Sequence, residues 1–465
     1  MAQTMPAVAA ADPQDGGGQH GDLAFFRGIG MGDQMLGDLF GLRTALGRSG
    51  VTFTVQDVNE VFANATGGLS TQPAYDGVTQ FTLQLDTEQA FGLSGGLLNA
   101  SALLLRGYNI STNNLLQLQI VSDIAGEPAL RLWELWYQQK LLSDDRLDVR
   151  VGQQSLDQEF MISQNSLYFI NAMSGWPMVP SADLPGGGPA YPLSMLGARV
   201  RYRPTDSVTA MAGLYNGSPT WTSMGNAQFL NPSGTYFGTG DGVFLIFELQ
   251  FSNEADPSDE DDVRRRPLGG TYKIGAWYNS LGFNDLRYDN TGLSLANPYS
   301  TGAPMTHSGN YSLYAVADQV LWRDGRDPTR SLSAYARAMW TPQSDRNLID
   351  FSLNAGVIHH NPLPNRPDDV LGLSVGYAHV SAATSGLDAD TIFYNQQAGT
   401  PVNWLVRRSE TFFELTYIAQ VKRWWQIQPD FQYVFNPGGG LVNPNNPTQA
   451  IANEFIAGIR TTIQF

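Results

Sequence analysis

Residues 132–140 read Leu132-Trp133-Glu134-Leu135-Trp136-Tyr137-Gln138-Gln139-Lys140. Successive side chains of a strand point to opposite faces, so this run presents one apolar row and one polar row. Two runs with the same alternation follow, at residues 147–153 and 196–204. Together the three runs give an apolar row of Trp133, Leu135, Tyr137, Leu147, Val149, Val151, Leu196, Ala198, Val200 and Tyr202. A soluble sandwich would bury this row, whereas a membrane barrel would turn it toward lipid.

The composition suits one large barrel. Of the 465 residues, 42% are hydrophobic and only 15% are charged, and there are 49 glycines and no cysteine. No apolar run approaches the ~18–20 residues that a membrane helix needs. The net charge of −16 argues against a nucleic-acid partner, whose phosphates require a basic surface. The lack of cysteine excludes disulfides and thiolate chemistry, and we expect no cofactor.

The periodicity divides the chain into three parts. Residues 1–35 are rich in Ala, Gly, Asp and Gln without a period, which predicts a mobile periplasmic tail. Residues 36–50 carry apolar side chains near helical spacing and are predicted to form a short helix at the periplasmic end of the barrel. Residues 51–465 keep a period of two, which predicts the outer-membrane β-barrel itself.

The barrel is predicted to be an all-β, transmembrane, antiparallel structure of about sixteen strands. The strands are expected to begin near residues 51, 78, 92, 130, 146, 194, 207, 242, 270, 310, 330, 347, 368, 409, 424 and 453. Short connections alternate with long ones near 106–129, 158–193, 216–241, 282–309, 381–408 and 436–452. That alternation is typical of outer-membrane barrels, with the short turns in the periplasm. We expect the longest connection, 158–193, to fold inward and narrow the pore.

Several motifs carry a family resemblance, in order along the expected strands and loops. They include ELWY at 134–137, SGWP at 174–177, GARVRYRP at 197–204 and QPDFQYVFNPGGG at 428–440. On these motifs the chain from about residue 37 to 465 resembles the carbohydrate-selective porins of the OprB type. The resemblance implies an outer-membrane channel of a Gram-negative bacterium that passes glucose and related sugars. It leaves open whether the channel is a monomer or a homo-trimer among its lipids.

The polar row of the first stretch is the predicted pore lining. Arginine suits sugar hydroxyls because its guanidinium group offers five fixed donors. The spacing of Arg199, Arg201 and Arg203 gives one strand a ladder of such groups along the lumen. The predicted substrate-binding residues are Glu134, Trp136, Arg150, Arg199, Arg201 and Arg203. Glu134 is expected to orient the arginines and Trp136 to offer a stacking face, although the same row could serve only to keep the wall wet.

Other functions stay open to different degrees. An anion- or phosphate-selective porin, or a general diffusion porin, is the main alternative, because the same arginines attract anions. An enzyme is not expected, because none of the five histidines pairs with a serine on an inward or rim position. A metal site at His359 and His360 is not expected either, because adjacent strand residues face opposite ways.

Overall fold

The computed structural model describes residues 33–142, 145–221, 225–238, 240, 242–253, 268–327, 329–400 and 402–465. Most of the predicted tail, and almost all of the charged connection between residues 253 and 269, lie outside the described residues.

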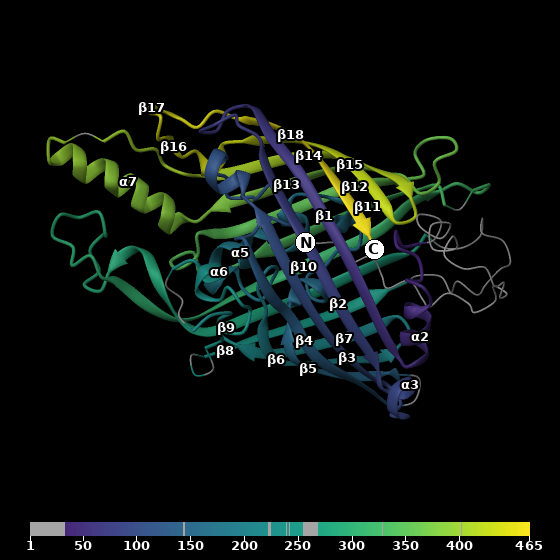
Figure 1. The fold of residues 1–465 in the computed structure, drawn as a ribbon. Coiled ribbons are helices and arrows are strands. Elements are labelled where there is room, and N and C mark those ends of the chain that lie inside the picture. The colour runs from purple at the N-terminus through teal and green to yellow at the C-terminus, as the bar shows by residue number, and fades with distance from the viewer. Residues whose placement is uncertain are drawn as a thin grey trace.

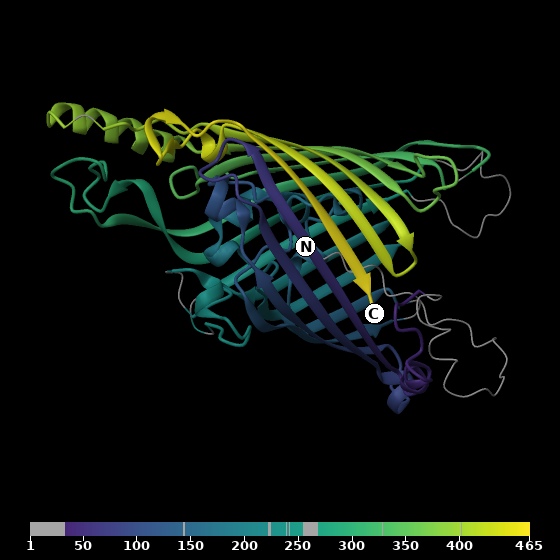
Figure 2. The ribbon, with the colours of Figure 1, turned by 45° about the horizontal axis from the view of Figure 1, so that its top comes forward.

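Sixteen antiparallel strands of the described chain close into a barrel, as the sequence predicts (Figures 1 and 2). They are β1 Val51–Thr66, β2 Ala74–Asp86, β3 Gly96–Gly107, β4 Ala129–Leu141, β5 Leu147–Gln154, β6 Met195–Thr205, β7 Val208–Asn216, β8 Val243–Ser252, β9 Gly270–Asp289, β10 Pro304–Arg323, β11 Ser331–Trp340, β12 Ile349–His360, β13 Val370–Val380, β14 Ser409–Lys422, β15 Trp425–Phe435 and β18 Glu454–Gln464. Pairing of β18 with both β1 and β15 closes the circuit. The two remaining strands, β16 Val442–Asn443 and β17 Asn446–Ala450, form a separate hairpin.

Three of the helices lie at the two ends of the barrel. The helix α2 (Leu42–Arg48) falls within the segment where the sequence predicts a short helix, and α3 (Thr87–Phe91) fills the turn between β2 and β3. Figure 1 shows both at one end, with the long α7 (Ala382–Gln397) at the other. Among the described residues, no helix is long and apolar enough to cross a membrane.

The two faces of the wall follow the predicted alternation. Strand β8 shows it most simply, because Leu245, Phe247 and Leu249 are exposed on the outside while Ile246 and Glu248 are buried on the inside. An exposed apolar band of this kind faces lipid in an outer-membrane barrel. The predicted outward row is therefore confirmed on this strand.

Trp133 departs from the prediction. The register of β3 against β4 shifts so that Ser101 pairs with Glu134 and Ala102 with Leu132, which leaves Trp133 as an extra residue. Trp133 is only 2% exposed and packs inside the barrel, with its ring 5.9 Å from that of Tyr191. The prediction that it faces lipid is wrong because a β-bulge inserts one residue and reverses the side chain.

Strands β9 and β10 are longer than the other strands of the barrel wall. Each has 20 residues. The pairing of β8 with β9 ends at Asn279, whereas β9 and β10 stay paired as far as Asp289 and Pro304. The pair therefore continues as a two-stranded ribbon beyond its neighbour β8, on the side of the molecule that carries α7 (Figure 1). Arg287 of β9 binds Asp390 of α7 at 2.8 Å and holds the helix against the ribbon.

Candidate functional site

The long connection between β5 and β6, residues 155–194, folds into the lumen. It contains short helical turns, η3 Leu156–Gln158, η4 Asn165–Tyr168, α4 Ala172–Gly175, α5 Met178–Asp183 and η5 Pro185–Gly187. Its backbone N–H groups at Met161 and Ile170 donate to Glu248 of β8 at 2.7 Å and to Glu414 of β14 at 2.5 Å. Contacts with strands so far apart in the barrel order require the loop to cross the interior, as the sequence predicts.

A second connection, residues 108–128, also folds inward, which sequence reasoning missed. The carboxylate of Glu410 on β14 accepts from the backbone N–H groups of Leu118 and Gln119 at 2.9 and 2.7 Å. Asp123 of the same loop forms an ion pair with Arg460 of β18. The sequence of the loop does not indicate that it folds inward, because the residues that bind it lie about 290 to 340 residues further along the chain.

Arg337 of β11 holds the first inward loop from another side. It is almost completely buried, and its Nη1 donates to the carbonyl oxygens of Met161 and Gly175 at 2.9 and 2.7 Å. Its Nη2 donates to those of Met173 and Ser174. Sequence reasoning did not select this residue, since it is one arginine in a row otherwise occupied by small, aromatic and apolar side chains.

Three of the four predicted arginines, Arg150 on β5 and Arg199 and Arg201 on β6, bind carboxylates. Arg199 is fully buried and binds Glu159 of the inward loop through Nε and Nη2, both at 2.6 Å, and also binds Asp148 of β5. Arg201 binds the other oxygen of Asp148 through Nε at 2.7 Å. Arg150 is 3.1 Å from Glu159. We call this set, Arg150, Arg199, Arg201, Asp148 and Glu159, the arginine cluster.

Glu159 joins the loop to this cluster. Burial by itself would raise the pKa of Glu159, but the guanidinium groups of Arg150 and Arg199 outweigh burial and hold it below its ordinary value. The residue is therefore a carboxylate at neutral pH and compensates the charges that surround it. The sequence offered only an indirect signal, namely that Glu159 lies at the start of the loop predicted to fold inward.

The remaining predicted site residues occupy different places. Glu134 is buried and accepts from the backbone N–H of Ser155 at 3.1 Å, so it fixes the start of the inward loop. Trp136 is also buried, and the guanidinium carbon of Arg150 lies 3.8 Å from the centre of its ring. Arg203 lies apart from the cluster, because the register of β6 against β7 breaks after Tyr202. Its Nη2 instead donates to the carbonyl oxygen of Asp145 at 2.8 Å, at an exposed turn.

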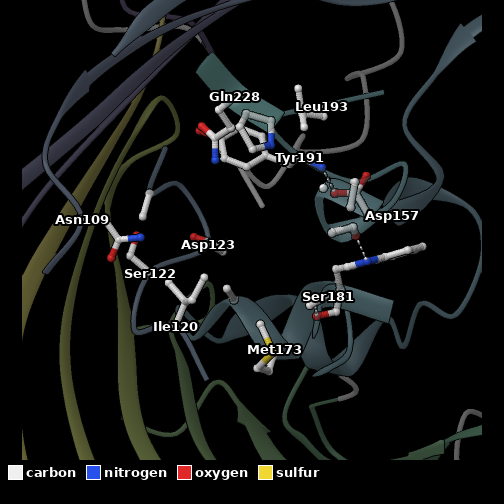
Figure 3. Close-up of a pocket in the computed structure, with 17 residues that line it drawn as sticks. Asn109, Ile120, Ser122, Asp123, Asp157, Met173, Ser181, Tyr191, Leu193 and Gln228 are labelled. Carbon is white, nitrogen blue, oxygen red and sulfur yellow. Dashed lines mark hydrogen bonds between the residues drawn. The ribbon is translucent and has the colours of Figure 1, made fainter. Parts of the chain in front are cut away.

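A cavity of about 260 Å³ lies between the two inward loops and Gln228 (Figure 3). Figure 3 shows Asn109 and Ser122 on one side of it and Tyr191 and Asp157 on the other. The hydroxyl of Tyr191 donates to the carbonyl oxygen of Ile124 at 2.8 Å, and its backbone N–H donates to Asp157 at 2.8 Å. The cavity thus combines aromatic, amide and carboxylate groups on loops that the barrel wall holds in place.

Asp157 connects this cavity to the arginine cluster. It lines the cavity, while Glu159 of the cluster follows two residues later on the same loop. Burial raises the pKa of Asp157 above its ordinary value, although bonds from Ser155 and Tyr191 oppose the shift. The cavity and the cluster are therefore adjacent polar regions built from one loop.

Comparison with known proteins gives consistent results. The model of the family described as "Carbohydrate-selective porin, OprB family" matches residues 70–465. Porin B of Pseudomonas aeruginosa is 25% identical over 451 residues, which cover 93% of this chain and 91% of that protein. The structure of Pseudomonas putida OprB at high pH has a TM-score of 0.79 at 24% identity, and covers 94% of this chain and 99% of the other. The low-pH structure of that protein has a TM-score of 0.54 at 17% identity, with the same coverage.

Proposed function

Because this chain belongs to the OprB family of carbohydrate-selective porins, a family of channels in the outer membrane of Gram-negative bacteria, we propose that it passes glucose and related sugars by passive diffusion into the periplasm. Membership of this family supports selectivity for carbohydrates as a class. The preference for glucose-like sugars, and the residues that contact them, are the proposal.

The observation that carries the proposal is that two carboxylates compensate most of the positive charge of the three arginines in the arginine cluster. Arg150, Arg199 and Arg201 face the carboxylates of Asp148 and Glu159 directly. A sugar needs many donors and acceptors but no net charge, and this arrangement supplies them in one place. An anion channel would instead leave the positive charges uncompensated so that they attract the ion. The anion alternative is therefore less well supported.

Arg201 is the member of the cluster best placed to meet a passing sugar. Its side chain is 33% exposed, compared with 14% for Arg150 and 0% for Arg199. Its bond to Asp148 uses Nε, so the two terminal nitrogens keep donors for a ligand. Arg199 has the role of a positioning residue that holds Asp148 and Glu159.

Stacking is assigned to the cavity rather than to Trp136. Arg150 covers one face of the Trp136 ring, so Trp136 orients that guanidinium group. Tyr191 and Trp176 line the cavity, where an aromatic face can pack against the C–H face of a sugar. We therefore place the sugar first between the two inward loops and then beside the arginine cluster.

Replacing Arg201 with alanine tests this assignment. Each charge-assisted hydrogen bond contributes about 1.5–3 kcal/mol, and less at a wet site, so sugar affinity should fall by roughly tenfold. Small-ion conductance should stay the same or rise, because the substitution leaves the inward loops anchored. The affinity is measured as glucose block of ion current in planar bilayers.

Arg203→Ala is the matched control. It makes the same substitution on the same strand, but at the exposed turn, and should leave glucose block unchanged. A second measurement, of block by phosphate, distinguishes a sugar channel from an anion channel. In an anion channel phosphate block would collapse in Arg201→Ala and glucose would never have blocked. Unchanged glucose block in Arg201→Ala would remove Arg201 from the site.

A further inference from the structure

Three side chains from separate segments meet near the base of the β9–β10 ribbon. Asp285 lies on β9, His307 on β10, and Asp345 on the short connection between β11 and β12. The pairing of β8 with β9 ends six residues before Asp285, at Asn279, so the group lies beyond the end of β8. Neither the arginine cluster nor the cavity includes these residues.

We propose that Asp285, His307 and Asp345 form a binding site for a divalent transition-metal ion such as Zn²⁺. The Nε2 atom of His307 lies 2.8 Å from Oδ2 of Asp285 and 3.7 Å from Oδ2 of Asp345. All three donor atoms lie within 4.8 Å of one another. A tetrahedral ion with bonds of about 2.1 Å holds its donors about 3.4 Å apart, so only small side-chain movements are needed.

The backbone prepares Asp285 for this role. Its Oδ1 accepts from the N–H groups of Arg287 and Tyr288 at 2.8 and 2.7 Å, which directs Oδ2 toward His307. The link carrying Asp345 is tied to β9, because the N–H of Leu286 donates to the carbonyl oxygen of Asp345 at 2.8 Å. Fixed ligands of this kind reduce the entropy that ion binding must overcome.

One cation already faces the group. Arg346 binds Oδ1 of Asp345 through Nε at 2.8 Å and Oδ2 through Nη2 at 3.2 Å. The guanidinium group therefore competes with a metal ion for Asp345, which limits the affinity. The guanidinium group of Arg287 also attracts the carboxylate of Asp285, but it binds Asp390 directly. Among the described residues, the ion pair of Asp285 Oδ2 is the one with His307.

The ligand set selects the kind of ion. One imidazole nitrogen and two carboxylate oxygens suit Zn²⁺ and similar ions, whereas Mg²⁺ and Ca²⁺ prefer oxygen ligands alone. The side chains of His307 and Asp345 are 19% and 42% exposed, so water reaches the site and can complete the coordination. A bound ion would fasten the ribbon to the connection between β11 and β12.

Zn²⁺ titration of the full-length barrel in detergent tests the site. Isothermal calorimetry should detect one ion per barrel, and His307→Ala should weaken its binding by more than about tenfold, since a ligand is lost. Asp345→Asn should weaken it as well, while leaving the bond between His307 and Asp285. Glucose block should be the same with and without Zn²⁺, so this result is separable from the proposed sugar function.

A matched control is available on the neighbouring strands. His379 on β13 lies 2.6 Å from Asp350 on β12 and forms a histidine–aspartate pair, but this pair is not part of a three-ligand group among the described residues. His379→Ala should leave Zn²⁺ binding unchanged. The proposal is overturned if the wild type takes up no Zn²⁺, if His307→Ala binds it as well as the wild type, or if His379→Ala abolishes binding.

Discussion

The arginine cluster and a second group of polar residues along the lumen use buried charge in different ways. We call the second region, Glu248, Asp318, Arg337, Glu410, Glu414 and Gln432, the anchoring wall. Its charged groups bind the backbone of the inward loops, as Glu410 does with Leu118 and Gln119. In the arginine cluster the charged side chains bind mainly one another, and Arg201 keeps part of its surface exposed.

The difference indicates that the two regions of the lumen have different roles, one in fixing the loops and the other in contacting the ligand. Groups that satisfy backbone N–H and carbonyl groups fix the position of a loop and have little capacity left for a ligand. Paired side chains of opposite charge with exposed edges keep donors and acceptors facing the water. We therefore expect damage to the anchoring wall to change the size of the pore, and damage to the arginine cluster to change what the pore selects.

The largest effect is expected from Arg337→Met, which keeps an unbranched apolar stem but removes every donor. Four carbonyl oxygens of the inward loop lose their partner, and breaking a buried charged network typically costs about 3–5 kcal/mol. The loop should detach while the barrel stays closed. Single-channel conductance should rise several-fold, and glucose block should weaken with it.

Arg330→Met is the control for this variant, because Arg330 is exposed at the start of the same hairpin arm. It should conduct like the wild type. Heat-dependent gel mobility reports whether the barrel of each variant has folded. Wild-type conductance in a folded Arg337→Met barrel would show that the other anchors hold the loop without Arg337.

Much of the wall could be predicted from the sequence, because period-two alternation and the spacing of turns act locally. The largest offset is at β10, which begins at Pro304 rather than near residue 310. The same alternation cannot separate the two regions of the lumen, since Glu414 and Arg201 both lie on inward positions. The arginines were found because they are concentrated on two strands, whereas the members of the anchoring wall are scattered one or two to a strand.

Two failures share a physical cause. Trp133 turns inward at a bulge between β3 and β4, and Arg203 leaves the ladder where the register of β6 against β7 shifts. One extra residue changes the alternation of side chains between the two sides of the bulge, and a bulge depends on the partner strand as well as on the local sequence. The inward loop 108–128 was missed because its anchor, Glu410, is distant in the chain.

Glu159→Gln should have an intermediate effect, on selectivity rather than on pore size. The amide keeps the shape but removes the charge that compensates Arg150 and Arg199. Anion preference, measured as the reversal potential in a salt gradient, should therefore increase.

The effect of pH follows from the pKa of Glu159. Because this pKa is lowered, the side chain stays charged at every pH above the ordinary value near 4.3, and it loses its charge only as the pH falls through the lowered value. The difference between variant and wild type should thus be constant from pH 7 to about 5. An unchanged reversal potential would contradict the role assigned to this carboxylate.

The smallest effect is expected from Asp183→Asn, the same acid-to-amide change at the other end of the same loop. Oδ1 of Asp183 accepts from the N–H of Leu348 at 2.6 Å, and an asparagine oxygen can accept that bond equally well. Burial raises the pKa of Asp183 well above its ordinary value. A raised pKa means that the charged form costs stability, and that this cost appears as the pH rises through the raised value.

Asp183→Asn should therefore match or slightly exceed the heat stability of the wild type at pH 8, converge with it at low pH, and conduct normally. Heating series on gels at pH 8 and pH 5 measure the stability, and bilayer recording measures the conductance. If Asp183→Asn instead opens the pore as Arg337→Met is expected to, the negative charge itself anchors the loop, and the contrast between a wall that binds backbone and a cluster that balances charge fails at this contact.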